Sequence, residues 1–174
     1  SYESKAGALK SKIREIESQI ASLHKNQAVF STVRPIAQWT FDVDAHDQLG
    51  SLHASTNLKT QFGGGHLTAS TLTTGPIQTD IKEKTLEVWV TVKKPLENLI
   101  SVFQIYNRSG YRGAASDGIQ FAGGANKQWR NLSTANFRTQ DVNGPKETAA
   151  PGDEIHLAFS YASDGTIRQY RNGA

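Results

Sequence analysis

Hydrophobic residues near the start of the chain recur at the spacing of an α-helix. Six of them, separated by 3, 4, 3, 4 and 3 positions, form the a/d repeat of a coiled coil: Ala6, Leu9, Ile13, Ile16, Ile20 and Leu23. The pattern predicts an amphipathic helix over residues 1–26 and a linker over residues 27–35. Fewer than three heptads make a weak coiled coil, so the stripe needs a partner. Either the chain's own domain or a neighbouring segment covers it, or two copies associate as a short coiled coil.

After Val33-Arg34-Pro35 the period changes from that of a helix to that of a strand. Runs rich in β-branched and aromatic residues alternate with turns containing Gly, Pro, Asn and Asp. The predicted strands are Ile36–Val43, His66–Ala69, Thr85–Val92, Ile100–Tyr106, Gly118–Ala122, Gln128–Ser133, Ile155–Tyr161 and Thr166–Arg171. No second helical pattern interrupts them, which excludes parallel βαβ units and predicts an all-β, antiparallel two-sheet sandwich over residues 35–174.

Two strand segments carry further information. In Thr85–Val92 the even positions share one face and should be buried, whereas Trp89 shares the other face with Glu87 and Thr91. Residues 162–166 read as a hairpin turn between the last two strands. The chain then stops at Arg171-Asn172-Gly173-Ala174, which resembles the entry to another turn, so we expect the domain to be incomplete at its C-terminal end.

Composition and charge narrow the function. The 174 residues are 37% hydrophobic and 20% charged, as in a globular domain, and the absence of cysteine excludes disulfides, thiolate catalysis and cysteine-based zinc sites. Six of the 19 basic and three of the 16 acidic residues lie in 1–34, which leaves thirteen of each sign in the predicted sandwich. A neutral sandwich argues against nucleic-acid binding. No membrane span or signal peptide is expected, so an export signal would lie outside this chain.

Several phrases of the sequence, taken together and in order, are those of a known family. They are Ala37-Gln38-Trp39-Thr40-Phe41-Asp42, Gly64-Gly65-His66-Leu67, the run Ile81-Lys82-Glu83-Lys84-Thr85-Leu86-Glu87-Val88-Trp89-Val90, Phe137-Arg138-Thr139-Gln140-Asp141, Gly144-Pro145-Lys146-Glu147-Thr148, His156-Leu157-Ala158, Asp164-Gly165-Thr166-Ile167 and Tyr170-Arg171-Asn172-Gly173. Residues 35–173 resemble the laminin-G-like, concanavalin A-like (lectin/glucanase) sandwich domain of large exported planctomycete proteins that also carry cytochrome c-like domains.

The resemblance implies a jelly-roll sandwich preceded by a helix, an extracytoplasmic location (periplasmic or secreted) and a binding role. The partners it implies are carbohydrate and the neighbouring domains of a larger chain. The family's ligand is not established, so the resemblance leaves the function open.

Catalytic patterns are weak in this sequence. Retaining glucanases of this fold need two carboxylates about 5 Å apart, and Glu87 stands alone on its strand face. No Gly-x-Ser-x-Gly elbow accompanies the serines, and His156 is expected to be a hydrogen-bonded core residue. The three glycines Gly63–Gly65 read as a tight turn and not as a phosphate-binding loop. We therefore expect no enzyme activity, with glycoside hydrolysis as the disfavoured alternative.

An acidic turn follows the first predicted strand. Asp42, Asp44 and Asp47 offer carboxylate oxygens of the kind that calcium prefers, and laminin-G-like domains often hold one calcium ion. The spacing is not that of an EF-hand. The turn is therefore either a solvated acidic loop, which we favour, or a calcium site, and no other cofactor is expected.

The stretch 106–139 is the most polar and aromatic-rich between strands. Its candidate sugar-binding residues, which combine stacking rings with planar hydrogen-bonding groups, are Asn107, Arg108, Tyr111, Arg112, Trp129, Arg130, Asn136 and Arg138. The alternative is that Trp129 belongs to the core and that the arginines are solvated or paired with aspartates. We expect a non-catalytic, carbohydrate-binding module, with an architectural or protein-interaction domain as the alternative.

Overall fold

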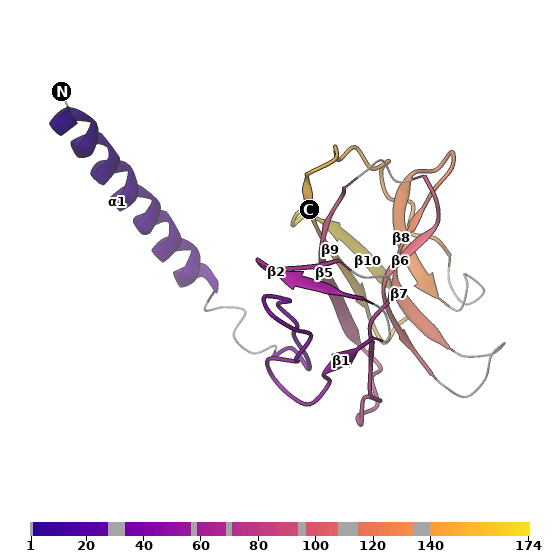
Figure 1. The fold of residues 1–174 in the computed structure, drawn as a ribbon. Helices are drawn as coiled ribbons and strands as arrows, with labels where there is room; N and C mark the ends of the chain where they lie inside the picture. The colour runs from indigo at the N-terminus through magenta and orange to yellow at the C-terminus, as the bar shows by residue number, and fades with distance from the viewer. Residues whose placement is uncertain are drawn as a thin grey trace. The chain divides into compact units, whose positions relative to one another are not determined.

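A computed structural model describes residues 2–27, 34–56, 59–68, 71–93, 97–107, 115–133 and 140–174. The chain divides into two compact units, Ser1–Gln78 and Thr79–Ala174. It is mostly antiparallel β-structure with one N-terminal helix, as the sequence pattern predicts (Figure 1). Within the described residues no helix is long and apolar enough to cross a membrane.

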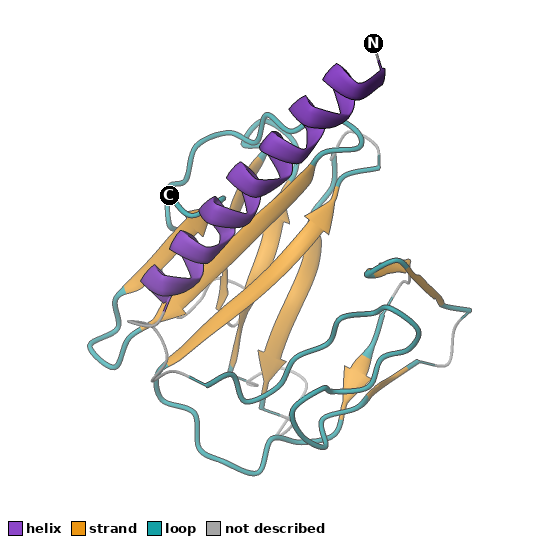
Figure 2. Ribbon diagram, turned by 90° about the vertical axis from the view of Figure 1, so that its left-hand side faces the viewer, coloured by secondary structure: helices purple, strands orange, loops and turns teal. Residues whose placement is uncertain are grey.

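The first unit contains the helix α1 (Tyr2–Gln27) and four short strands, β1 (Ala54–Ser55), β2 (Gln61–Gly63), β3 (His66–Thr68) and β4 (Thr73–Thr74). The prediction of a helix over 1–26 is confirmed, and most of the predicted linker lies outside the described residues. β1 pairs with β4, and β2 pairs with β3 through a turn in which Gly64 and Gly65 have positive φ angles. Loops make up most of the rest of residues 34–78 (Figure 2).

The strand predicted over Ile36–Val43 is wrong. Phe41 has a φ of 59°, a left-handed conformation that a strand cannot continue through. Side-chain hydrogen bonds hold the segment in a loop instead: the Trp39 Nε1 donates to the Leu52 carbonyl at 2.9 Å, and the Gln38 amide donates to the Asp47 carboxylate at 2.9 Å.

The described residues of the second unit form two three-stranded antiparallel sheets. One has the order β10-β9-β5, with β5 (Lys84–Thr91), β9 (Glu154–Tyr161) and β10 (Ile167–Arg171). The other has the order β6-β7-β8, with β6 (Ile100–Tyr106), β7 (Ser116–Ala122) and β8 (Gln128–Ser133). The six predicted strands of this unit are therefore confirmed, as is the turn between β9 and β10.

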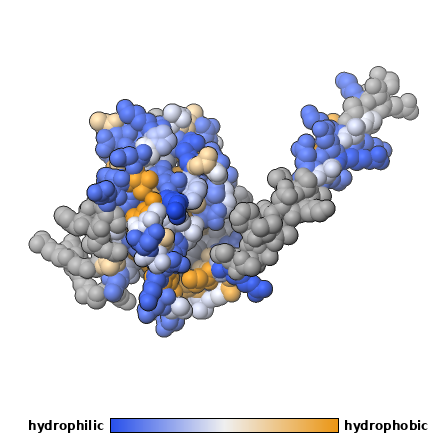
Figure 3. All heavy atoms as spheres, turned by 180° about the vertical axis from the view of Figure 1, so that it is seen from behind, coloured by the Kyte–Doolittle hydropathy of each residue, from blue (hydrophilic) through white to orange (hydrophobic). Residues whose placement is uncertain are grey.

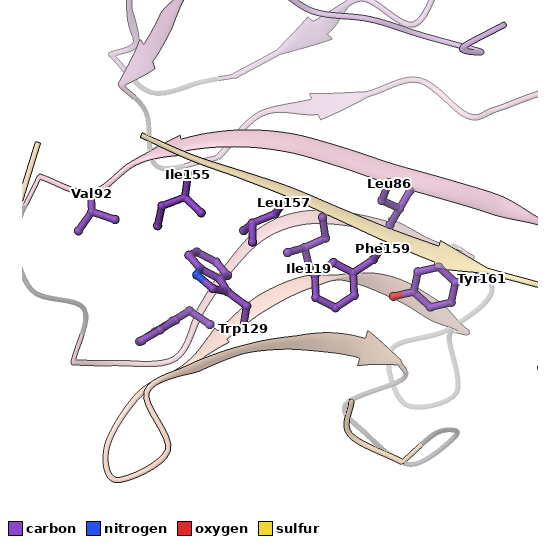
Figure 4. Packing of buried hydrophobic residues seen from close by; sticks show 9 residues of the cluster. Leu86, Val92, Ile119, Trp129, Ile155, Leu157, Phe159 and Tyr161 are labelled. Atoms are coloured by element: carbon purple, nitrogen blue, oxygen red, sulfur yellow. The ribbon is translucent and has the colours of Figure 1, made fainter. Parts of the chain in front are cut away.

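The core of the second unit lies between its two sheets, whose inner side chains converge in Figure 4. Its buried members are Leu86, Val92, Ile119, Phe121, Trp129, Ile155, Leu157, Phe159 and Tyr161. The alternation of β9 is complete, because its odd positions from Ile155 to Tyr161 are buried and the residues between them are not. On β5 the predicted inner face is confirmed, with Leu86 buried and Val88 and Val90 packed against the cluster. The arrangement is that of a β-sandwich.

One carboxylate joins the two sheets at an edge. The segment after β8 runs beside that strand, where Lys146 forms a bridge with Gln128. Glu147 then turns inward, accepting a hydrogen bond from the Trp129 Nε1 of β8 at 2.6 Å and one from the Arg171 guanidinium of β10 at 2.7 Å. We call Glu147, Trp129 and Arg171 the edge clamp.

Candidate functional site

Of the eight residues predicted to bind sugar, one lies in the core and five lie outside the described residues. Trp129 is only 2% exposed and packs edge-to-face on Phe121 with ring centroids 5.2 Å apart, so the prediction that its ring stacks on a ligand is wrong. Successive side chains of a strand point to opposite faces, and the Trp129 side chain lies on the face of β8 that points between the sheets. The following residues lie outside the described residues: Arg108, Tyr111, Arg112, Asn136 and Arg138.

The other two predicted residues do not form a site together. The Arg130 guanidinium is bonded to the Asp141 carboxylate at 3.0 Å, as the alternative interpretation expected. Asn107 is exposed just after β6, where its amide donates to the Ala115 carbonyl. In the register of β7 these residues lie beside Gln120 and Ala115, about 17 Å apart along the strand. The structure therefore assembles no sugar site from the described members of the predicted set.

The three aspartates of the acidic turn are likewise not brought together. Asp47 is buried and its carboxylate accepts the backbone amides of Gln38, Leu49 and Leu52 at 2.9–3.1 Å. Burial acts to raise the pKa of Asp47, but these three hydrogen bonds outweigh it and lower the pKa below its ordinary value. Asp47 thus organises its loop, and its oxygens are already used by backbone donors.

The Asp44 carboxylate bonds to the amide and to the Nδ1 of His46, and these bonds lower the pKa of Asp44. Asp42 is exposed. Over the part of the chain that the structure describes, no three His, Cys, Asp or Glu side chains are grouped as a metal site would require. In the described residues the three aspartates therefore do not form a shared carboxylate cluster.

The outer face of the β10-β9-β5 sheet carries exposed aromatic and polar residues that the sequence interpretation did not assign to a candidate site. Trp89 is 59% exposed, and its ring stacks on that of His156 with centroids 4.5 Å apart and an interplanar angle of 24°. The two residues are direct partners in the register of β5 and β9, so the backbone places the rings together.

A carboxylate fixes this stack. The His156 Nε2 lies 2.6 Å from the Glu87 Oε1, and Glu87 points to the same side of β5 as Trp89. This hydrogen bond holds the imidazole plane against the indole ring. The expectation that His156 is hydrogen-bonded is confirmed, but it is not a core residue, because it alternates outward between buried Ile155 and Leu157.

Tyr170 of β10 completes the arrangement. Its ring is 39% exposed and it pairs with Ala158, which on the other side pairs with Glu87. Tyr170 and Trp89 thus lie on one face, two strands apart and two residues out of row, at about 12 Å. We call Glu87, Trp89, His156 and Tyr170 the aromatic platform. The sequence pattern indicates part of this platform, since Trp89 and Glu87 are at the alternate positions of β5 that point away from the core.

Within the described strands β5, β9 and β10, the outer face does not hold a pair of carboxylates at catalytic spacing. Its other glutamate on these strands is Glu154, which pairs with Thr91, four register positions from the row of Glu87. That separation is about 13 Å along the strands, beyond the roughly 5–9.5 Å of retaining and inverting glycosidases. The platform offers stacking surface and a few hydrogen-bonding groups.

Comparisons of the chain with models of known protein families, with curated proteins and with solved structures find no match in any of the three.

Proposed function

We propose that this chain is a non-catalytic binding module that binds neutral carbohydrate through the aromatic platform. The observation that supports the proposal is an exposed indole ring held in place: one side of Trp89 rests on His156, and Glu87 fixes His156. An aromatic face stacks on the apolar face of a sugar ring, and a ring that is already ordered loses little entropy on binding. Tyr170 provides a second ring on the same surface.

The finer description of the fold belongs to the same proposal. The antiparallel two-sheet unit is compatible with a laminin-G-like jelly roll, and such domains commonly act as binding modules within larger exported proteins. The extracytoplasmic location and the neighbouring domains of a larger chain rest on the sequence resemblance. The sheet itself supports a binding role, because it holds the platform on paired strands.

The absence of catalysis is supported by the spacing of Glu87 and Glu154. We expect no release of reducing sugars from any polysaccharide tested. Release that Glu87→Gln abolishes would overturn the non-catalytic proposal, because it would give that carboxylate a catalytic role.

Titration of the full chain with a panel of neutral oligosaccharides tests the binding proposal. A shallow surface that stacks one or two rings gives dissociation constants of about 10⁻³ to 10⁻⁵ M. Trp89→Ala should weaken binding at least about tenfold. Because the sugar is uncharged, the affinity should change little with salt, whereas an acidic polysaccharide would bind more weakly as screening rises.

The matched control is Tyr106→Ala. Tyr106 is also an exposed aromatic residue, but it lies on β6 in the other sheet, at the start of the stretch 106–139. Its replacement should leave the affinity unchanged. Binding that depends on Tyr106 and not on Trp89 would refute the platform and return the site to that stretch.

A second candidate function is that of an architectural or protein-interaction domain without a small-molecule ligand. The exposed apolar side chains of α1 favour it, since they are a surface for protein contacts. If no oligosaccharide binds at millimolar concentration, this function replaces the first.

A further inference from the structure

The helix α1 presents an apolar stripe to solvent in the isolated chain. Leu9, Ile13 and Ile16 are 66%, 49% and 48% exposed, and they follow the a/d positions of the heptad repeat. The residues described around the rest of this part of the helix are polar or charged apart from Gly7, and Figure 3 shows a largely hydrophilic surface there. One narrow stripe of this kind is the seam of a two-stranded coiled coil.

We propose that the stripe is covered by α1 of a second copy of this chain, in antiparallel orientation. Antiparallel helices pair each a position with a d position of the partner. When Ile13 faces Ile16 of the other copy, Leu9 meets position 20, which is also isoleucine, and position 6 meets position 23. The a/d pattern of the sequence is therefore self-complementary in this orientation.

The charges beside the seam decide the orientation. In a parallel pair each g residue faces the e residue of the partner's next heptad. Lys12 would then face Glu17, but Lys5 would face Lys10, and both contacts occur twice. One attraction is therefore cancelled by one repulsion.

In the antiparallel pair, e faces e and g faces g. Lys10 then faces Glu17 of the partner, twice by symmetry, and Lys12 faces Gln19. The described flanking positions make two attractions and no repulsion. In the antiparallel arrangement the two helix dipoles also point in opposite directions, so the positive end of each helix lies beside the negative end of the other, which is favourable.

Association through so short a seam is weak. A seam of fewer than three heptads without other contacts gives a dissociation constant on the order of 10–100 µM. Sedimentation of the full chain from about 5 to 500 µM should therefore show a monomer converting to a dimer. Ile16→Asp places a charge in the seam and should leave a monomer at every concentration.

The variant that separates the two orientations is Lys10→Glu. In the antiparallel dimer it turns two attractions into repulsions against Glu17 and should weaken association about tenfold. In a parallel dimer it would face Lys5 and strengthen association. The matched control is Arg14→Glu, which changes the net charge equally at a b position, away from the seam, and should change the affinity less than twofold.

Two further measurements complete the test. The double variant Lys10→Glu/Glu17→Lys restores both antiparallel pairs and should recover the original affinity. Because the chain has no cysteine, a spin label at Gly7→Cys is unique, and an added Cβ there meets nothing within 4 Å. The two labels should be offset by about 22 Å along an antiparallel dimer and by none along a parallel one.

A chain that stays monomeric at 500 µM overturns the proposal. Association that Lys10→Glu strengthens, or labels at the same axial level, overturns the orientation. Neither result depends on sugar binding, so this proposal and the aromatic platform fail or succeed independently.

Discussion

The edge clamp gives the sharpest stability prediction, for Glu147→Gln. The Glu147 carboxylate is 5% exposed and accepts hydrogen bonds from Trp129, Arg171 and the backbone amides of Thr148 and Ala149, all at 2.6–3.1 Å. Glutamine has the same shape but no charge, and its amide nitrogen is a donor that would face other donors. The substitution therefore removes the interaction and leaves the pocket filled.

The magnitude follows from the protonation equilibrium. Burial acts to raise the pKa of Glu147, but the Arg171 side chain, the Ala149 amide and the Trp129 ring lower it from 4.5 to about 2. A shift of that size corresponds to about 3 kcal/mol of folding free energy. Because Arg171 is 30% exposed, solvent screens part of this, and we expect Glu147→Gln to cost about 2 kcal/mol at pH 7.

The pH dependence has a definite sign. The pKa of Glu147 is lower in the folded chain, so its contribution is fully present above pH 4.5 and is lost as the pH falls through about 2. The free energy of unfolding of the original chain should therefore fall towards that of Glu147→Gln in this range. Above about pH 5.5 the difference between them should be constant.

Urea unfolding followed by circular dichroism at pH 7, 5, 3.5 and 2.5 measures this difference. Glu154→Gln, the same substitution at an exposed position of β9, is the control and should cost less than about 0.5 kcal/mol. A cost at Glu147 below 0.5 kcal/mol at pH 7, or a difference that does not shrink at low pH, would refute the reasoning.

Two further substitutions test packing and loop structure. Gly118→Ala would place a Cβ 2.3 Å from the Phe103 carbonyl oxygen, so the strands β6 and β7 must separate. We expect the free energy of unfolding, measured by heat or urea, to fall by about 2–4 kcal/mol. An unchanged midpoint of unfolding would contradict this contact. Asp47→Asn removes the charge that three backbone amides share, so those amides should exchange hydrogen for deuterium faster in the variant; equal exchange rates would show that the carboxylate does not organise the loop.

The strands of the second unit could be predicted because alternation and burial coincide there. The predicted bounds Ile100–Tyr106 and Gln128–Ser133 are those of β6 and β8, and β9 begins one residue before its predicted start. A strand with one buried face shows a period of two, and the turns between strands contain the residues that turns require.

The first unit was less predictable for a physical reason. Its strands β1, β2 and β4 have two or three residues, too few to show any period, and the sequence interpretation missed them. The run Ile36–Val43 has the composition of a strand, but long-range bonds to Asp47 and Leu52 hold it in a loop. Those partners lie 9 and 13 residues away, beyond a local pattern.

For the candidate site, the alternation of residues along each strand predicts which side chains are exposed, whereas the composition of a segment does not. The stretch 106–139 was chosen for its polar and aromatic content, which does not say whether a ring points inward. Trp129 does point inward, whereas Trp89 was already assigned to the outward side of β5. His156 could have been placed by the same rule, because it lies between Ile155 and Leu157.

The opposite positions of Trp89 and Trp129 give the second unit two intrinsic optical reporters. Trp89 is exposed to solvent and stacked on the His156 ring, whereas Trp129 is buried in the core. A ligand on the outer face should alter the fluorescence of Trp89 and leave that of Trp129 unchanged. Opening of the sandwich should shift the emission of Trp129 to longer wavelength. In a Trp39→Phe variant, which removes the third tryptophan of the chain, binding and unfolding are therefore spectroscopically separable without any added label.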